Sequence, residues 1–310
     1  MKICHLTSVH NSHDTRIFYK ECTFLSNLGN EVYLVATGES RNENNVKVIG
    51  VGPKARNRIL RILFTTRKVY MSALKTNADI YHIHDPELLL YALNLKKHNK
   101  KVIFDSHENI LEYFESKDYI PKLIKSTVVK LLNKYLHKTL SKLNGLISVT
   151  PFICTKLKQL NSNTLLITNY PSTKEVLFES TKRKKQICFT GSISKQWNLE
   201  TALNAIKDID DIKLILCGNF ENDKYKTSLQ KRPEWNKCYY LGRLPHNDVL
   251  RVQSTSMVGI ALLNYSKNTN NNEGTLGNTK LFEYLASGLP IICTNFLLWR
   301  EIIEKYNCGM

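Results

Sequence analysis

Short apolar runs of strand length alternate with longer amphipathic segments along the first half of the chain. We expect strands over residues 3–7, 32–36, 46–51, 79–84, 101–105 and 145–149. The segments between them predict helices over about residues 15–28, 56–76, 87–97 and 121–143. Strands separated by helices of this length are typical of parallel β-α-β units, with helices on both faces of a sheet.

The same alternation starts again after a polar stretch. Residues 172–186 contain five Lys/Arg and show no period, so we interpret residues 171–186 as a linker between domains 1–170 and 187–310. In the second domain we expect strands over residues 187–190, 213–217, 238–241, 258–262 and 290–294, and a helix over 279–287. Two Rossmann-like, doubly wound parallel-sheet domains in succession imply a central cleft where strand ends face a ligand.

The last segment, residues 300–310, predicts a helix followed by Cys-Gly-Met. A parallel domain that stops there lacks a final strand and helix. We therefore expect a chain that is truncated at its C-terminus, exposes apolar surface and has little activity as it stands.

A loop rich in Gly and Asn, residues 274–278, opens the helix expected at Thr279. A helix N-terminus with free backbone N–H groups and a neighbouring lysine, Lys280, suits a diphosphate. Glu283 lies one turn further along, so both side chains can face one ligand, and a carboxylate can accept both hydroxyls of a ribose. The alternative is an ordinary helix with a Lys/Glu pair on its surface, and the spacing alone does not choose between them.

The segment around this loop, Lys280-Leu-Phe-Glu-Tyr-Leu-Ala-Ser-Gly-Leu-Pro-Ile-Ile292, resembles the donor-binding signature of family 4 glycosyltransferases, which are retaining enzymes of the GT-B fold. The likeness continues along the chain. Residues 13–32 resemble the family's first β-α-β unit, and residues 78–86 and 104–108 (Phe-Asp-Ser-His-Glu) resemble two landmarks of its acceptor domain.

The resemblance implies roles for particular residues. Glu283 would hold the donor ribose, and Lys280 with the backbone of Asn278 and Thr279 would hold the diphosphate. Gly191, after the second domain's first strand, would let backbone approach phosphate closely, since glycine has no Cβ.

On the acceptor side, the resemblance implies that His107 faces the sugar, while Asp14 and Arg16 lie on a loop that borders the reacting centre. His82 and His84 stand on one strand, and we expect only one of them to face the ligand. We favour His84, because it precedes Asp85 at the carboxyl end of the strand, where ligands of such sheets bind.

Two positions depart from the family's pattern. Many relatives carry a second glutamate eight residues before the first, but that position is Thr275, and Glu273 lies two residues away. Relatives also carry a basic residue in the first loop of the donor domain, and here Lys195 is displaced by two residues. Recruitment of Lys195 to phosphate is therefore a weaker expectation, and contacts to the sugar hydroxyls stay unassigned.

No metal or cofactor is expected to take part in the reaction. The sequence contains no H-E-x-x-H motif of a zinc enzyme, and it contains no G-x-S-x-G motif of a serine nucleophile. The resemblance implies transfer with retention, and no carboxylate can be named as a nucleophile. We therefore expect a same-face mechanism in which the leaving diphosphate accepts the acceptor's proton. The nucleotide sugar is a substrate; the sugar, the nucleotide and the linkage are not specified by the sequence.

The eight cysteines form no C-x-x-C pair, and Cys4, Cys188, Cys217 and Cys293 lie inside apolar runs. This favours reduced core thiols over a zinc site or a disulfide framework. No apolar run is long enough to span a membrane, and the N-terminus lacks the features of a signal peptide. We expect a cytoplasmic protein. If it docks on an anionic membrane, as considered below, it would be located at the inner face of the cytoplasmic membrane.

The formal net charge is +17, of which residues 1–170 carry +12. Such a charge favours anionic partners. One face of the expected helix 121–143 carries five lysines, at 122, 130, 134, 138 and 142, and the opposite side is apolar and includes Leu131. A second basic group lies between residues 56 and 68 and consists of Arg56, Arg58, Arg61, Arg67 and Lys68. The alternatives are a solvated helix face and docking on an anionic membrane, which suits a polyprenyl-diphosphate-linked acceptor of bacterial surface polysaccharide synthesis.

Three other functions compete with glycosyl transfer: a catalytically inactive GT-B binding subunit, a sugar-nucleotide 2-epimerase and a nucleic-acid-binding protein. The missing glutamate at Thr275 keeps the first open. The extra acid/base residues of an epimerase are not evident. Nucleic-acid binding has only the charge in its favour, since no aromatic-basic platform motif occurs, and no nucleic-acid partner is expected.

Overall fold

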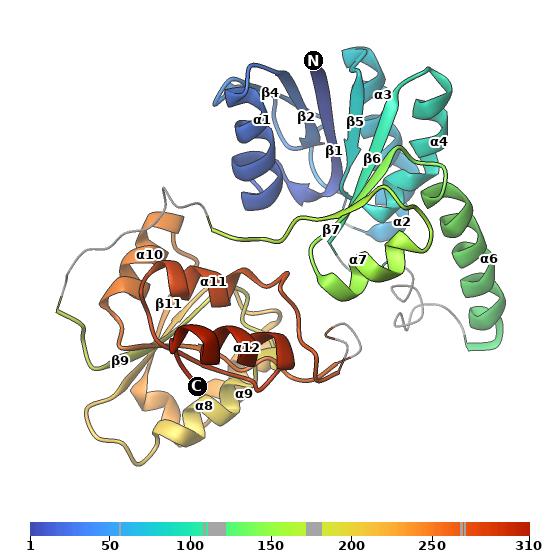
Figure 1. Cartoon of the computed structure of the whole chain (residues 1–310). Coiled ribbons are helices and arrows are strands. Elements are labelled where there is room, and N and C mark those ends of the chain that lie inside the picture. The colour runs from blue at the N-terminus through green and yellow to red at the C-terminus, as the bar shows by residue number, and fades with distance from the viewer. Residues whose placement is uncertain (56, 108–109, 111–121, 172–181, 267–268, 270) are drawn as a thin grey trace. The chain divides into compact units, whose positions relative to one another are not determined.

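The computed structural model describes residues 1–310 except 56, 108–109, 111–121, 172–181, 267–268 and 270. The chain divides into two compact units, Met1–Thr168 and Asn169–Met310, each built around one sheet (Figure 1). This division falls close to the expected end of the first domain at residue 170. Most of the expected linker, residues 172–181, lies outside the described residues.

The N-terminal unit contains an eight-stranded sheet with the order β3-β4-β2-β1-β5-β6-β7-β8. All neighbours are parallel except β3, which pairs antiparallel with β4. The six strands expected in this half are confirmed, whereas β3 and β8 are too short to show a pattern. The strands are β1 (Lys2–Asn11), β2 (Glu31–Thr37), β3 (Arg41–Glu43), β4 (Val46–Gly50), β5 (Ile80–Ile83), β6 (Lys101–Ser106), β7 (Gly145–Ser148) and β8 (Thr164–Leu166).

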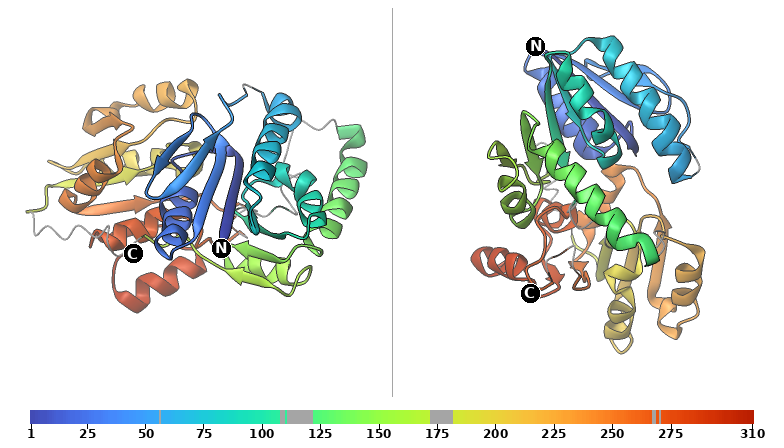
Figure 2. Two further views of the ribbon diagram at one scale, coloured as in Figure 1. Left: turned by 90° about the horizontal axis from the view of Figure 1, so that it is seen from above. Right: turned by 90° about the vertical axis from the view of Figure 1, so that its right-hand side faces the viewer.

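The helices of this unit follow the expected segments but are divided more finely. The first is a π-helix, η1, which continues into α1, and the basic segment is divided among α2, η2 and α3. Figure 2 shows α3, α4 and α6 following one another beside the sheet. The elements are η1 (Thr15–Cys22), α1 (Thr23–Asn27), α2 (Arg58–Leu60), η2 (Arg61–Thr65), α3 (Thr66–Thr76), η3 (Pro86–Leu88), α4 (Leu89–Lys97), α6 (Lys122–Leu140) and α7 (Pro151–Lys158).

Successive side chains of a strand point to opposite faces, and the two faces of this sheet differ. Leu6, Ile83 and Phe104 belong to a large apolar core with α3, α4 and α6. On the other face, η1 packs through Ile17 and Phe18 against β2 and β4. At the centre of that face, however, β1 and β5 carry buried histidines instead of apolar residues.

The C-terminal unit contains a fully parallel five-stranded sheet with the order β11-β10-β9-β12-β13. All five expected strands and the helix at Thr279 are confirmed. The strands are β9 (Gln186–Thr190), β10 (Lys213–Cys217), β11 (Cys238–Gly242), β12 (Val258–Ala261) and β13 (Ile291–Cys293). The helices are η5 (Lys195–Trp197), α8 (Leu199–Ile206), α9 (Asp223–Gln230), η6 (Pro233–Lys237), α10 (His246–Thr255), α11 (Thr279–Ala286) and α12 (Leu297–Tyr306).

The residues after α12 return to the sheet. The amide of Ile291 donates to the carbonyl of Cys308 over 3.0 Å, and the amide of Met310 donates to the carbonyl of Ile291 over 2.8 Å. The last three residues therefore pair with β13 in parallel, which the sequence did not lead us to expect.

Both sheets reverse their strand order at one point, between β1 and β5 in the first unit and between β9 and β12 in the second. Ligands of doubly wound sheets bind at the carboxyl ends of the strands beside such a point. Throughout the described part of the chain, no helix combines the length and the apolar character that crossing a membrane requires.

Candidate functional site

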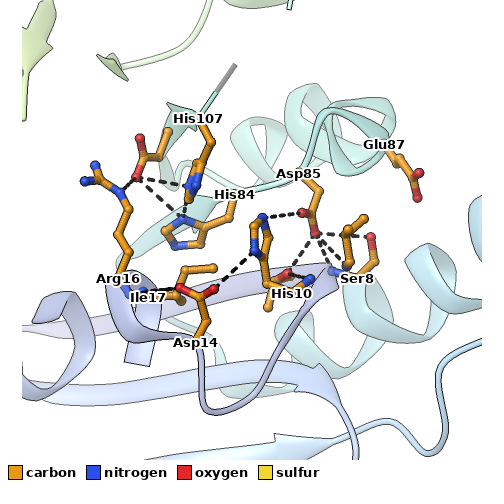
Figure 3. A network of polar contacts seen from close by, with 12 residues as sticks. Ser8, His10, Asp14, Arg16, Ile17, His84, Asp85, Glu87 and His107 are labelled. Carbon is orange, nitrogen blue, oxygen red and sulfur yellow. Dashed lines mark hydrogen bonds and ion pairs between the residues drawn. The ribbon is translucent and has the colours of Figure 1, made fainter. Parts of the chain in front are cut away.

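The first candidate site is a hollow of about 340 Å³ at the carboxyl ends of β1, β5 and β6. His10, His84, Asp85 and His107 contribute polar groups to its lining, and Leu90 lies among its apolar residues. Figure 3 shows how these polar side chains converge from three strand ends. A concave site with few polar groups and an otherwise apolar wall is typical of small-molecule binding.

Asp85 organises the loop after β1. Its Oδ2 accepts hydrogen bonds from the Thr7 hydroxyl (2.9 Å) and from the amides of Ser8 and Val9, the latter at 3.1 Å. Its Oδ1 lies 3.6 Å from His10 Nε2. The buried carboxylate thus ties two neighbouring strand ends together and holds His10 at the hollow.

Asp14 caps the helix that follows this loop. Its Oδ1 accepts from the amides of Arg16 (2.9 Å) and Ile17 (3.0 Å), and its Oδ2 lies 3.3 Å from His10 Nδ1. Burial alone would raise the pKa of Asp14, but the hydrogen bonds from His10 and Ile17 outweigh it and lower the pKa to about 2. Asp14 is therefore an anion that orients His10.

Arg16 lies beneath the hollow and does not contribute to its lining. Its Nε is 2.9 Å from Asp105 Oδ2 and 3.0 Å from Glu21 Oε1, and an Nη donates to the carbonyl of Ile167 over 3.2 Å. The resemblance had suggested a place beside the reacting centre. In the structure, the guanidinium lies between two buried carboxylates, those of Asp105 and Glu21.

His107 follows β6 and contributes to the lining of the hollow. Its Nε2 lies 3.4 Å from Asp105 Oδ2 and 3.4 Å from His84 Nδ1, and its ring centroid lies 5.0 Å from that of His10. Asp105 thus orients His107 from below. Glu108, quoted with it in the sequence motif, lies outside the described residues.

His82 and His84 lie on the same face of the sheet, because residues two apart on a strand share a face, so they differ in their position along the strand and not in their face. Their rings stack with centroids 4.5 Å apart. His5, in register with His82 on the neighbouring strand, joins them from β1. His84 alone of the three contributes to the lining of the hollow.

Glu21 completes this cluster and was not identified from the sequence. It lies five residues after Arg16, a spacing that would separate the two side chains on an α-helix. The π-helix η1 has i→i+5 hydrogen bonding, and the amide of Tyr19 approaches the carbonyl of Asp14 at 3.4 Å. This geometry brings Arg16 and Glu21 to the same side of η1, so the missing signal was the helix type.

The second candidate site lies at the carboxyl end of β9. Gly191 has φ +115°, and a Cβ there would lie 2.5 Å from Lys280 Nζ. Lys280, in the first turn of α11, therefore presses its ammonium group against the backbone of the first loop of the unit. The two residues that the resemblance linked to phosphate are in contact.

Lys280 is 8% exposed. Its Nζ lies 4.0 Å from the centroid of the Trp197 ring and 5.0 Å from that of Phe189. Burial lowers the pKa of Lys280 to about 8, partly offset by the charge of Glu283. Within the described residues, no carboxylate lies within ion-pair distance of Nζ, so the aromatic faces supply its main electrostatic support.

The start of α11 is arranged around Asn278, whose Oδ1 accepts from the amide of Lys280 over 3.0 Å. Thr279 is the first residue of the helix, and Glu283 is half-buried one turn after Lys280. Asn278 therefore caps the helix with its side chain, and the expected role of its backbone toward a diphosphate stays a prediction.

Lys195 is exposed, and its backbone is held by Glu221 and Asn264. Thr275 shapes the loop before α11: its hydroxyl accepts from the amide of Gly277, and its carbonyl accepts from Trp299 Nε1 over 2.7 Å. Trp299 is fully buried, as expected for a packing residue. A local structural role thus explains Thr275.

Comparison with known proteins gives the family. The profile for "Glycosyltransferase Family 4" matches residues 15–165, and that for "Glycosyl transferases group 1" matches residues 173–310. A search of curated proteins finds no significant match.

Solved structures share the fold at low sequence identity. Sucrose-phosphate synthase from Thermosynechococcus elongatus superposes with a TM-score of 0.71 at 13% identity, over 94% of this chain and 80% of that one. WaaG, a glycosyltransferase involved in lipopolysaccharide biosynthesis, gives 0.70 at 12%, over 100% and 85%. HepE of Anabaena, in complex with UDP and glucose, gives 0.68 at 10%, over 94% and 80%. With both profiles matched in order and two parallel α/β units, the chain belongs to the family 4 glycosyltransferases of GT-B fold.

Proposed function

We propose that this glycosyltransferase moves a sugar from a nucleotide-sugar donor, with retention, to a glycan or polyprenyl-diphosphate-linked acceptor in bacterial surface polysaccharide synthesis. The observation that carries the proposal is a contact between two residues. The buried ammonium group of Lys280, in the first turn of α11, lies against Gly191, which follows β9. A buried cation beside a helix N-terminus and an open backbone is suited to a diphosphate.

In the proposed reaction, the bond between the anomeric carbon and the diphosphate oxygen breaks first. The acceptor oxygen bonds to that carbon from the same face, and its proton passes to the departing diphosphate. Lys280 would lie where negative charge grows, and it would then stabilise the transition state more than the bound substrate. Glu283, one turn along α11, would hold the ribose.

The hollow of the N-terminal unit is the proposed acceptor-side surface. His10 and His107 line it, and Asp14 and Asp105 hold these rings in place. The opposite wall, with Leu90, Leu132 and Leu136, is apolar. A polar acceptor hydroxyl next to an apolar carrier would fit such a two-sided surface.

Contact with an anionic membrane is supported by exposed apolar residues next to basic ones. Ile59, Leu63 and Phe64 of α2 and η2 are 70%, 58% and 59% exposed, and Arg67 and Lys68 follow them on the surface. Arg61 is less available, because it pairs with Glu87. Arg56, and the side chains of Arg58 and Lys122, lie outside the described residues.

Helix α6 contributes three exposed lysines, at 130, 134 and 138, to the same proposal. Leu131, which we had placed on its apolar side, is instead 65% exposed, whereas Leu136 and Leu140 are buried as expected. Each basic residue near an anionic surface contributes about 1 kcal/mol. Sedimentation with vesicles of anionic lipid at low salt, compared with neutral vesicles, tests the docking; equal recovery with both would contradict it.

The activity itself is tested with a panel of nucleotide sugars, each incubated with and without a lipid-linked acceptor. UDP-glucose starts the panel, since HepE was solved with UDP and glucose. Nucleotide release that requires the acceptor supports transfer. Conversion of the sugar donor without acceptor would point to an epimerase, and binding without turnover to an inactive subunit.

A further inference from the structure

Four potential metal ligands converge on one buried point of the N-terminal unit. Glu21 Oε2 lies 3.7 Å from His5 Nδ1, 3.9 Å from His82 Nδ1 and 3.7 Å from His84 Nε2. His5 Nδ1 and His84 Nε2 are 2.9 Å apart. All three histidines are buried, and the side chain of Glu21 is 17% exposed.

The convergence follows from strand register. His5 and His82 are paired across β1 and β5, and His84 follows His82 on the same face. The π-helix η1 covers this face and directs Glu21 into it. Three histidines therefore replace the apolar residues that a sheet centre ordinarily carries.

Hydrogen bonds within the cluster satisfy only part of it. His5 Nδ1 and His84 Nε2 lie within hydrogen-bond distance of each other, at 2.9 Å. The buried Glu21 Oε2, which lies within 4 Å of a nitrogen of each of the three rings, has no hydrogen-bond partner among the described residues. Burying a carboxylate oxygen without a partner is unfavourable, and a bound cation would remove that cost.

The spacing matches what a tetrahedral zinc ion requires. Zinc binds nitrogen and carboxylate oxygen at about 2.0–2.2 Å, so ligand atoms around it lie about 3.3 Å apart. The recorded separations of 2.9–3.9 Å lie on either side of this value. All four ligand atoms lie within 4.8 Å of one another, so side-chain adjustments would bring them onto one ion.

The surroundings match those of a metal site at Glu21 and His84, whereas the outer Nε2 atoms of His5 and His82 have no hydrogen-bond partner among the described residues. Metal-bound histidines and carboxylates are held by hydrogen bonds from outside the coordination sphere. Here Glu21 Oε1, the oxygen turned away from the cluster, lies 3.0 Å from Arg16 Nε. His84 Nδ1 lies 3.7 Å from Asp105 Oδ2. Arg16 brings one positive charge to two carboxylates, Glu21 and Asp105, and a divalent cation would balance the other.

We propose that His5, His82, His84 and Glu21 bind one divalent transition-metal ion of the zinc type, as a structural site that fastens η1 to the sheet. Four protein ligands fill a tetrahedral sphere, as in structural sites. The ion would fix the helix that carries Arg16 and follows Asp14, beneath the hollow. It is separate from the transfer reaction, for which no metal is expected.

Metal analysis of the purified full chain, after dialysis without chelator, is the first test. We expect about one zinc per chain, lost on treatment with a strong chelator. Zinc added back should raise the midpoint of thermal unfolding. Cobalt(II), as a spectroscopic probe, should give the intense visible absorption of a tetrahedral site.

The matched variants are Glu21→Gln and His82→Asn, the second of which places an amide where Nδ1 stood. Both should lose the bound zinc and the thermal shift. His246→Gln removes an exposed histidine of the other unit and should keep both. If a variant fails to fold, the cobalt spectrum of the wild-type chain still decides.

Wild-type chain that carries no zinc, is not stabilised by added zinc and gives no tetrahedral cobalt spectrum would overturn the proposal, and the cluster would then hold a shared proton. Zinc retained by Glu21→Gln and His82→Asn but lost in His246→Gln would also overturn it. None of these readouts depends on sugar transfer, so this proposal and the proposed function can fail separately.

Discussion

Buried charged groups at the strand ends have different partners in the two units. Around β1, β5 and β6, carboxylates, histidines and Arg16 contact one another, so most charges have a partner inside the protein. At the end of β9, one ammonium group, Lys280, is buried against a glycine and two aromatic rings. In the first arrangement most charged groups contact an opposite charge, whereas in the second the ammonium group has no carboxylate partner among the described residues.

This difference predicts that substitutions at the two sites affect different properties of the protein. A buried ion pair that loses one partner leaves an uncompensated charge, which is strongly destabilising. A buried cation without a carboxylate already carries that cost in the free protein. Substitutions at the first site should therefore lower stability, and substitutions at Lys280 should lower activity alone.

Arg16→Met should have the largest effect. It leaves the carboxylates of Glu21 and Asp105 buried without their cation, and we expect a loss of about 3–5 kcal/mol in the free energy of unfolding. All three tryptophans, at 197, 235 and 299, lie in the C-terminal unit. In urea unfolding, the part of the far-UV circular dichroism transition that reports the N-terminal unit should move to lower urea concentration. The midpoint of the tryptophan fluorescence transition, which reports the C-terminal unit, should not change.

Arg41→Met is the matched control for Arg16. Arg41 pairs with Glu43 at 2.7 Å, but both side chains are partly exposed, so its loss should cost about 1 kcal/mol or less. Equal losses for the two variants would remove the distinction between the buried cluster and the surface.

Lys280→Met should come next, with the opposite pattern. Removal of one group that stabilises charge in a transition state costs about 100- to 1,000-fold in turnover. The free energy of unfolding should not fall, because the methionine fills the same space without a buried charge. Steady-state kinetics with a saturating acceptor and urea unfolding measure the two effects, and Lys231→Met, at an exposed position of the same unit, serves as the control.

Glu283→Ala should weaken use of the sugar donor by about 10- to 150-fold, the cost of one hydrogen bond to a charged group. The measurement is kcat/KM at varied donor concentration. Many relatives carry a second glutamate at the position of Thr275, and Glu273→Ala tests whether Glu273 takes over its role. A change below about threefold for Glu283→Ala would remove that residue from the site.

The pH dependence of nucleotide affinity should show the smallest effect. Lys280 has a pKa of about 8, and only its protonated form attracts a diphosphate. Affinity should therefore be full below this value and fall by about tenfold between roughly pH 7 and pH 9. Calorimetric titration with a nucleoside diphosphate at several pH values measures it, and Lys280→Met should be insensitive over that range.

The sequence predicted most of the fold, because the alternation of strand-sized and helix-sized segments is a local signal. Elements too short for a period were missed, such as β3 (Arg41–Glu43) and β8 (Thr164–Leu166). The pairing of Cys308–Met310 with β13 was missed too, since it depends on a partner strand and not on the segment itself.

The candidate site was predicted unevenly for a similar reason. Lys280 and Gly191 stand out within short motifs, and the structure brings them together. The partners of Arg16 are distant in sequence, and Glu21 looks like one more polar residue of an amphipathic helix. His82 and His84 share a face of the sheet, so the sequence distinguishes them only by their position along the strand.

The π-helical winding of η1 makes this region sensitive to chain length. An α-helix turns about 100° per residue, so rewinding η1 as an α-helix of the same length, or inserting one residue between Arg16 and Glu21, would turn the acid away from the arginine. Point substitutions at the outward positions of η1 leave the alignment intact. Natural variation in this helix should therefore consist of replacements, with insertions confined to α1 and the turn after it.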